Sequence, residues 1–189
     1  MNNQSVCPWQ AGSILAMPIR KLAHNPHRIV SPYISEGMTV MDIGCGVGFF
    51  TIPMAEITGK HGRVIAVDLQ PEMLAGLDNN ARKAGVDNIT LHQCAANSLN
   101  IGQWEGSISF VLIMMMLHEV PDPDRLIKEV YSAVASGGKL LFSEPVGHVS
   151  ADQFQSSVTM IQQAGFNIIA KPKVRICRSA VFEKKRNQP

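Results

Sequence analysis

Residues 40–50 read VMDIGCGVGFF, an apolar run followed by an acid and three glycines in close succession. The apolar run predicts a buried strand, and the apolar segment after the glycines predicts a helix. The glycines at 44, 46 and 48 carry no side chains at the turn between the two, so another molecule can approach the backbone closely there. We therefore expect a ligand to bind at this turn, beside the carboxylate of Asp42.

The remainder of the chain repeats this alternation of strand and helix. Strands are predicted at residues 38–43, 63–69, 88–94, 107–116 and 139–145, and helices at 49–58, 71–85, 122–138 and 150–165. The long apolar run at 107–116 is typical of a central parallel strand. The helix over 122–138 is expected to carry Val134 on its apolar face and to end at Gly137.

Two further strand-like segments, 166–172 and 174–185, follow with no helix between them. Strands joined by so short a link pair antiparallel or belong to different edges. Repeated strand–helix units predict a parallel sheet with helices on both faces. The predicted fold class is therefore α/β, a doubly wound, Rossmann-like and mostly parallel sheet. Ligands of such sheets bind at the carboxyl ends of the strands, where the strand order reverses.

The composition of the 189 residues is that of one globular domain, with 46% hydrophobic and 17% charged residues. A formal net charge of +2 and a short basic tail, EKKRNQP, give no reason to expect a nucleic-acid partner. The longest apolar run has about ten residues, too few to span a bilayer, and no signal peptide is evident. The four cysteines show no CxxC spacing, so we expect no metal site and a cytoplasmic location.

The glycine spacing and the preceding acid distinguish between two classes of cofactor. Dinucleotide sites use GxGxxG and place the pyrophosphate at the helix N-terminus, whereas residues 44–48 give GxGxG. Asp42 would repel a pyrophosphate and suits a cationic ligand such as S-adenosylmethionine, which has an ammonium and a sulfonium centre. Asp68, at the end of the second predicted strand, is placed to accept hydrogen bonds from ribose hydroxyls. Asp68 alone fits NAD equally well, and Asp42 alone also fits an acid that caps a helix or braces the loop.

Three segments and the closing strand pair together resemble the successive motifs of class I S-adenosylmethionine-dependent methyltransferases. The segments are VMDIGCGVGFFT at 40–51, VIAVDLQPEML at 64–74 and LHEVPDPDRLIKEVYSAVASGGKLLFSEP at 117–145. The chain is similar to the small single-domain members, in the group that includes ubiquinone and menaquinone biosynthesis methyltransferases. The resemblance covers residues 38–183 and implies a seven-stranded sheet whose antiparallel last strand lies beside the fifth. It also implies S-adenosylmethionine as the cofactor and methyl transfer to a small-molecule acceptor as the reaction.

The resemblance assigns cofactor contacts to four parts of the chain. The glycine loop would surround the methionine moiety, Asp68 would hold the ribose and Leu69 would lie against the adenine. An acid that is usual after the third strand is replaced here by alanine, so adenine contacts are expected from backbone groups, Asn97 or Ser98. The methionines at the end of the fourth strand would line the other side, although such residues more often fill a core than contact a ligand. The implied cofactor-binding residues are Asp42, Gly44, Cys45, Gly46, Gly48, Asp68, Leu69, Ala95, Ala96, Asn97, Met114 and Met115.

Methyl transfer is an in-line displacement, to which correct positioning contributes about 7–11 kcal/mol. A general base is needed only if the acceptor arrives protonated. We expect His118 to act as that base or to orient the acceptor, because imidazole titrates near neutral pH. Glu119 is the second catalytic candidate, and Glu144 and His148 follow the fifth strand. For His118 the alternative is a residue that braces the loop, and for the two glutamates it is hydrogen bonding to loop amides.

The N-terminal residues 1–35 are expected to form a helical lid, and residues 36–189 the cofactor-binding domain. Trp9, His24, His27 and Tyr33 would meet the acceptor from the lid. No D/N-P-P-Y/F tetrapeptide follows the fourth strand, so the resemblance does not extend to enzymes that methylate DNA adenine or glutamine. Cys7 and Cys45 do not form a convincing arsenite site. We expect a small organic acceptor and no membrane partner. Two possibilities are retained. The protein could form a homodimer, and the alternative to an enzyme is a regulatory subunit that binds the cofactor without turnover.

Overall fold

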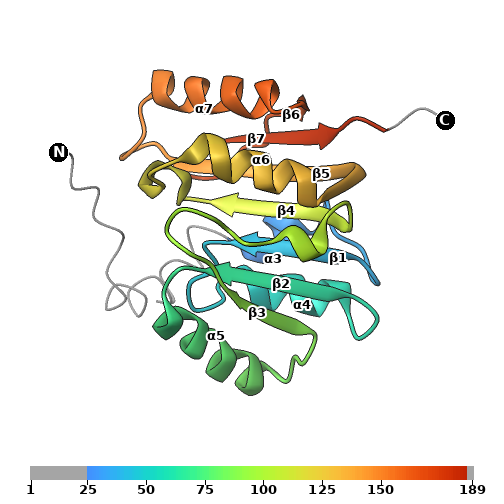
Figure 1. Cartoon of the computed structure of the whole chain (residues 1–189). Coiled ribbons are helices and arrows are strands. Elements are labelled where there is room, and N and C mark those ends of the chain that lie inside the picture. The colour runs from blue at the N-terminus through green and yellow to red at the C-terminus, as the bar shows by residue number, and fades with distance from the viewer. Residues whose placement is uncertain (1–24, 187–189) are drawn as a thin grey trace.

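The computed structural model describes residues 25–186, which fold into a central sheet flanked by helices (Figure 1). These residues form seven strands in the order β3-β2-β1-β4-β5-β7-β6. The strands are β1 (Thr39–Ile43), β2 (Arg63–Asp68), β3 (Ile89–Gln93), β4 (Ile108–Met114), β5 (Val134–Pro145), β6 (Phe166–Ala170) and β7 (Cys177–Lys184). Strands β1 to β5 are parallel, and β7 runs antiparallel to both of its neighbours, β5 and β6. The predicted fold class is confirmed, and the last strand lies beside the fifth as the resemblance implies.

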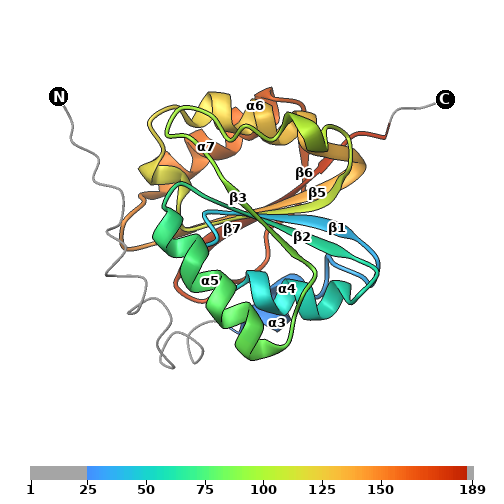
Figure 2. The same ribbon diagram turned by 60° about the horizontal axis from the view of Figure 1, so that its bottom comes forward.

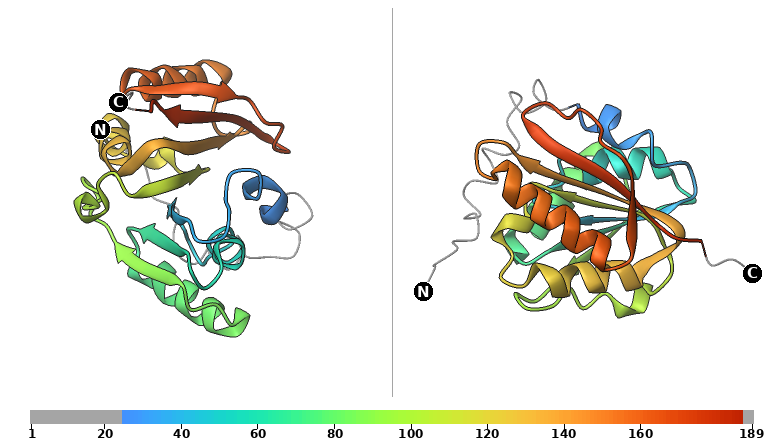
Figure 3. Two further views of the ribbon diagram at one scale, coloured as in Figure 1. Left: turned by 90° about the vertical axis from the view of Figure 1, so that its right-hand side faces the viewer. Right: turned by 90° about the horizontal axis from the view of Figure 1, so that it is seen from above.

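The helices cover both faces of the sheet, which makes the fold doubly wound (Figure 2). On one face lie α3 (Pro26–Val30), α4 (Thr51–Thr58) and α5 (Pro71–Ala84). On the other face lie α6 (Pro123–Ala133) and α7 (Ala151–Gln163). Figure 3 shows α7 lying along the β6–β7 end of the sheet. The strand order reverses between β1 and β4, so the loops after these two strands leave the sheet toward opposite faces and open a space between them.

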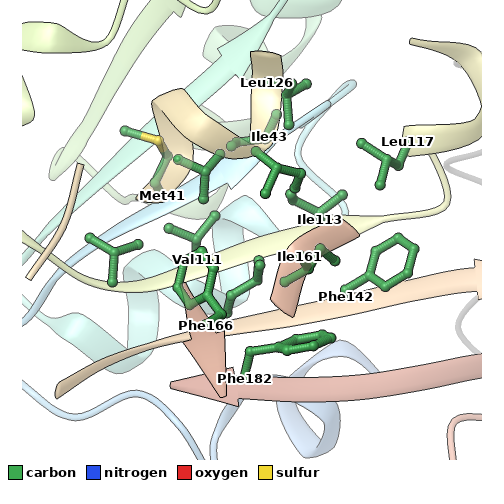
Figure 4. Packing of buried hydrophobic residues seen from close by; sticks show 14 of the residues in the cluster. Met41, Ile43, Val111, Ile113, Leu117, Leu126, Phe142, Ile161, Phe166 and Phe182 are labelled. Carbon is green, nitrogen blue, oxygen red and sulfur yellow. The ribbon is translucent and has the colours of Figure 1, made fainter. Parts of the chain in front are cut away.

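The core is divided between the two faces by the alternation of side chains along each strand. On the α6 and α7 side, Met41 and Ile43 of β1 pack with Val111, Ile113 and Phe142 (Figure 4). The intervening residues of the same strands pack against α3 and α4 instead. Because both faces are covered, β1 and β4 are apolar almost throughout, and this is why their runs of apolar residues predict central strands.

The chain before β1 contributes to the core on the α4 side. Asn25 caps α3 by accepting a hydrogen bond from the Arg28 N–H at 3.1 Å, so this end of the predicted helical lid contains a short helix. Val30 and Ile34 are buried, and the Tyr33 ring stacks on Phe110 with 5.8 Å between centroids. Residues 25–35 therefore belong to the packed domain. The remainder of the predicted helical lid, residues 1–24, lies outside the described residues.

The helix predicted over 122–138 is shorter than expected, because α6 ends at Ala133. Val134 is buried as predicted, but as the first residue of β5, where it pairs with Ile108 of β4. The side chain of Lys184 explains the early end. Its Nζ donates to the carbonyl of Tyr131 in the last turn of the helix at 2.7 Å, and to that of Val134, the residue after the helix, at 2.8 Å.

We expect Lys184→Met to lower the free energy of unfolding by about 1–3 kcal/mol, because two carbonyls lose a charged donor. The ammonium group also lies 4.4 Å from the centroid of the Tyr131 ring, and this contact is lost as well. Urea unfolding followed by circular dichroism measures the change. The neighbouring Lys185 is exposed, and Lys185→Met serves as the matched control with a change within about 0.5 kcal/mol. Equal unfolding midpoints for the two variants would contradict this account of the helix end.

Candidate functional site

A cavity of about 450 Å³ opens at the carboxyl ends of the strands, between the loops that follow β1 and β4. All predicted cofactor-binding and catalytic residues except Gly48 line it. The lining residues that sequence reasoning proposed are Asp42, Gly44, Cys45, Gly46, Asp68, Leu69, Ala95, Ala96, Asn97, Met114, Met115, His118 and Glu119. Residues from four separate loops are thus brought to one space, at the point where the strand order reverses.

The glycine loop is held on the end of β2 by three backbone donors. The N–H groups of Gly44 and Cys45 donate to the Val67 carbonyl at 2.9 and 3.1 Å. The Gly46 N–H donates to Oδ2 of Asp68 at 2.9 Å. Gly44 and Gly46 have φ angles of +72° and +52°, in the left-handed region where glycine is favoured. A Cβ atom at Gly46 would meet no other atom within 4 Å, so the backbone there faces open space.

Asp42 combines a bracing contact with a place in the cavity lining. Its side chain is only 3% exposed, and Oδ2 accepts a hydrogen bond from Thr51 Oγ1 at 2.6 Å. Thr51 is the first residue of α4, so the contact fixes the start of that helix relative to β1. The two interpretations of this acid, a loop brace and a ligand-binding carboxylate, are therefore compatible.

Asp68 is bonded on both carboxylate oxygens. Oδ2 accepts from the Gly46 N–H, and Oδ1 accepts from the Gln70 N–H at 3.0 Å. Burial raises the pKa of Asp68, and these N–H groups oppose that shift. Asp68 therefore braces the glycine loop as well as lining the cavity. Sequence reasoning assigned only the ribose contact, since the bond to Gly46 depends on how β1 and β2 pair.

Gly48 is the one predicted cofactor-binding residue that does not line the cavity. Its φ angle is +95°, and a Cβ atom there would lie 2.3 Å from Cδ1 of the buried Leu77 on α5. Gly48 therefore allows α5 to pack closely against the start of α4. Gly44 has a different neighbour: a Cβ atom there would lie 2.8 Å from Cγ of Met116, in the loop after β4.

The turn after β3 is built from the residues that replace the usual acid. The Ala95 N–H donates to the Ser98 carbonyl at 2.9 Å, and the Ser98 N–H donates back to the Ala95 carbonyl at 3.3 Å. Glu129 of α6 holds the next residues, with Oε2 accepting from the N–H groups of Leu99 at 2.9 Å and Asn100 at 3.1 Å. Sequence reasoning missed Glu129, whose sequence context is that of an ordinary surface position on an amphipathic helix.

The methionines after β4 serve both the core and the cavity. Met114 is buried in the cluster on the α4 side, and Met115 has a φ angle of +59°, unusual for a residue with a side chain. The Met115 N–H donates to the Ser143 carbonyl of β5 at 2.7 Å. This bond holds the sharp bend that turns the chain out of β4 toward His118.

His118 forms a close pair with the buried carboxylate of Glu144. His118 lies in a short 3-10 turn (Leu117–Glu119), and its Nδ1 is 2.7 Å from Glu144 Oε2. The His118 N–H also donates to Oε1 of Glu144 at 3.1 Å. The Glu144 side chain is 2% exposed; burial raises its pKa, and His118 opposes the shift. An ionised Glu144 can only accept, so Nδ1 would then be the donor of this bond, and Nε2 would keep a lone pair whenever the ring is neutral.

Two further titratable groups lie beside this pair. Nε2 of His118 is 3.9 Å from Oε1 of Glu119, and both residues line the cavity. The His148 ring, from the loop after β5, is 6.1 Å from the His118 ring in an edge-on arrangement. Three groups suited to proton transfer or to orienting a substrate are thus close to one another at this end of the cavity.

Two residues assigned to the lid lie elsewhere. His27 Nε2 is 2.7 Å from Glu56 Oε2, between α3 and α4, and Tyr33 packs in the core. Neither lines the cavity, and their positions agree with the alternative of ordinary packing or exposure. Trp9, His24 and Cys7 lie outside the described residues.

Cys45 and Cys94 line the cavity, and burial raises the pKa of both thiols, that of Cys94 to about 11. Within residues 25–186, no group of three or more histidines, cysteines and acids is arranged to hold a metal ion. None of the helices in this part of the chain is long and apolar enough to cross a membrane.

We expect Gly48→Ala to destabilise the protein by about 1–3 kcal/mol, through overpacking against Leu77 and a strained φ angle. Thermal and urea unfolding measure the change. Gly102→Ala is the matched control, because a Cβ atom there meets nothing within 4 Å and no positive φ angle is involved. If the two variants were equally stable, Gly48 would not be needed for the packing of α5.

A family model described as methyltransferase domain matches residues 34–183. An arsenite methyltransferase of Aquipseudomonas alcaligenes is 29% identical over 121 residues, covering 61% of this chain and 35% of that protein. A demethylmenaquinone methyltransferase of a Geobacillus species is 30% identical over 111 residues, covering 59% of this chain and 47% of that protein. The chain thus matches less than half of the length of these two relatives.

A solved structure supports the assignment of the fold. The crystal structure of an S-adenosylmethionine-dependent methyltransferase from Aquifex aeolicus superimposes with a TM-score of 0.85. The match covers 94% of this chain and 99% of that one at 19% identity. At this identity the likeness shows a shared arrangement of strands and helices.

Proposed function

Because this chain belongs to the family of methyltransferase domains, we propose that it transfers a methyl group from S-adenosylmethionine to a small organic acceptor. The observation that carries the proposal is one cavity that joins a carboxylate-flanked glycine loop to the His118–Glu144 pair. The loop provides a site for the methyl donor, and the pair provides a group that can activate an acceptor. The two lie at opposite sides of the reversal in strand order.

The lining of the cavity fits a cationic donor. Asp42, Asp68 and Glu119 are all acidic and line the same space. Opposite charges a few ångströms apart attract strongly where water is scarce, whereas a diphosphate would be repelled by these acids. The open space at Gly46 leaves room for a ligand against the backbone. Asp68 is placed to accept hydrogen bonds from ribose hydroxyls, which supports the adenosyl cofactor and would fit NAD as well.

The adenine end of the site depends on the turn after β3. This turn presents Ala95, Ala96 and Asn97 to the cavity, without the acid that is usual in the family. We propose that backbone groups of the turn and the Asn97 amide contact the base, with Leu69 against its face. Glu129 contributes indirectly, because its bonds to Leu99 and Asn100 hold the turn in place.

When bound, S-adenosylmethionine supplies an electrophilic methyl group. The residues of the chain position the acceptor and accept its proton. We propose that Nε2 of His118 removes a proton from the acceptor, and that Glu144 stabilises the resulting imidazolium through Nδ1. Glu119 and His148 lie close enough to orient the acceptor beside His118.

The cysteines make an organic acceptor more suitable than arsenite for this cavity. Trivalent arsenic is held by a set of cysteines, and within residues 25–186 no group of three or more histidines, cysteines and acids is arranged to hold such an ion. We also propose a cytoplasmic location, because the four cysteines of the sequence show no spacing typical of a disulfide framework. A regulatory role without turnover is not favoured, because the matching family model and the relatives are methyltransferases. That the protein forms a homodimer remains a prediction.

We expect Asp68→Ala to weaken the binding of S-adenosylhomocysteine about tenfold or more, since charge-assisted hydrogen bonds contribute about 1.5–3 kcal/mol. The loop at Gly46 also loses its partner. Isothermal titration calorimetry measures the affinity. Asp87→Ala, at an exposed position outside the cavity, is the matched control and should bind like the native chain. Unchanged affinity in Asp68→Ala would remove Asp68 from the cofactor site.

We expect His118→Asn to lower methyl transfer about a hundredfold or more, the range of general base catalysis, with S-adenosylhomocysteine affinity retained. Cell extracts incubated with methyl-labelled S-adenosylmethionine first identify the acceptor, and its rate of labelling is then compared between variants. His61→Asn, at an exposed site away from the cavity, is the control.

The pH–rate profile distinguishes a base from a structural residue. Only the loss of a base removes the fall in rate toward acidic pH. Full activity in His118→Asn would make this residue structural. A chain that binds S-adenosylhomocysteine yet labels no molecule in any extract would overturn the proposed enzyme activity.

A further inference from the structure

The loop between β6 and β7 lies beside the segment after β5, two residues of which line the cavity. Strand β6 runs antiparallel to β7, and β7 runs antiparallel to β5, so β6 points in the same direction as β5. Residues 171–176 therefore emerge at the same edge as the residues after β5. The Val146 N–H donates to the Ile176 carbonyl at 3.0 Å, which joins the two segments directly. Pro145 and His148, on either side of Val146, line the cavity.

Two exposed apolar side chains form a lip at this place. Val146 is 47% exposed and Ile176 is 57% exposed. Ile176 also has a φ angle of +56°, in the left-handed region that a β-branched side chain rarely adopts. Asparagine or glycine would fit this backbone with less strain, and a polar residue would suit the exposure. Ile176 thus combines backbone strain with exposed apolar surface. Strained residues and exposed apolar patches are both frequent at functional sites.

The same loop carries three cations. Lys171, Lys173 and Arg175 are exposed, in the segment KPKVR. In the part of the chain that the structure describes, neither lysine forms an ion pair. On the other side of the cavity, after β4, the lining residues Glu119 and Asp122 are acidic. The charge along this edge of the sheet is therefore divided, with acids toward the glycine loop and cations toward β6.

We propose that the acceptor is an apolar molecule that carries an anionic group, and that the β6–β7 loop recognises it. This inference rests on the proposed function. The apolar part lies on Val146 and Ile176, and Lys171, Lys173 and Arg175 attract the anionic group. The reacting atom then extends past His148 toward His118. An anionic membrane would meet the same charges, but a lip of two side chains that continues into the cavity lining fits a small molecule better.

The test uses a hydroxynaphthoate and its uncharged carboxamide as a matched pair of probes. Their binding to the full chain is measured by calorimetry with saturating S-adenosylhomocysteine. We expect the naphthoate to bind about threefold to tenfold more tightly than the carboxamide, the summed effect of a few exposed charge pairs. This preference should shrink as salt is added. In the triple variant Lys171→Gln, Lys173→Gln and Arg175→Gln the two probes should bind equally.

Two controls separate the charges from the apolar lip. The triple variant Lys60→Gln, Lys83→Gln and Lys185→Gln removes the same net charge from exposed sites outside the cavity lining, and should keep the preference. Ile176→Asn relieves the backbone strain and removes apolar surface, so it should fold and bind both probes about threefold more weakly, in line with the exposure of one apolar side chain.

The outcomes distinguish the inference from the proposed function. If S-adenosylhomocysteine binds but the native chain does not prefer the naphthoate, the inference is overturned and the methyltransferase assignment stands. If S-adenosylhomocysteine does not bind, the proposed function fails and the inference fails with it. Vesicles of phosphatidylcholine, with and without phosphatidylglycerol, test the other source of negative charge. Binding to the anionic vesicles that the loop variant loses, without any preference for the naphthoate, would assign the loop to a membrane surface instead.

Discussion

The attachment of the glycine loop to the end of β2 positions the rest of the site. Two N–H groups of the loop share the Val67 carbonyl, and a third donates to Asp68. Once these bonds form, the loop is fixed at one side of the cavity and α4 begins in a defined direction from β1. Asp42 reinforces that direction through Thr51. The positive φ angles at Gly44 and Gly46 are the backbone requirement of this arrangement, and glycine meets it without strain.

Asp68 makes this attachment at a cost to the stability of the fold. Burial raises the pKa of Asp68, which means that the carboxylate is less stable in the folded chain than in the unfolded one. For a group with a raised pKa, folding stability is greatest below the ordinary pKa and declines as the pH rises through the folded value. The contribution of Asp68 to the stability of the fold is thus smaller at neutral pH than below the ordinary pKa of its carboxyl group. A charge retained against that cost indicates a role beyond packing, and a cationic cofactor with ribose hydroxyls supplies one.

The parts of the site that follow strand ends were accessible from the sequence, and the parts that depend on pairing between distant segments were not. Asp42, Asp68 and His118 each follow an apolar run, so their position at the carboxyl edge could be inferred. The bond from His118 to Glu144 depends on the register of β4 with β5. The end of α6 depends on Lys184 from the last strand, and the need for Gly48 depends on Leu77 of another helix. These contacts join residues that are far apart in the sequence, so the pattern of neighbouring residues does not predict them.

Acids and cations are separated along the carboxyl edge of the sheet, and this separation makes the two ends of the site electrostatically different. Acids cluster where the glycine loop, β2 and β4 end, and they favour a cationic donor there. Cations follow β6, on the far side of His118 and His148 in the strand order. An acceptor held by those cations at its anionic group keeps that group away from Asp42 and Asp68, whose charges would repel it. Its other end is then the one that meets His118. The same electrostatic pattern that draws in the donor would in this way decide which end of the acceptor reaches the methyl group.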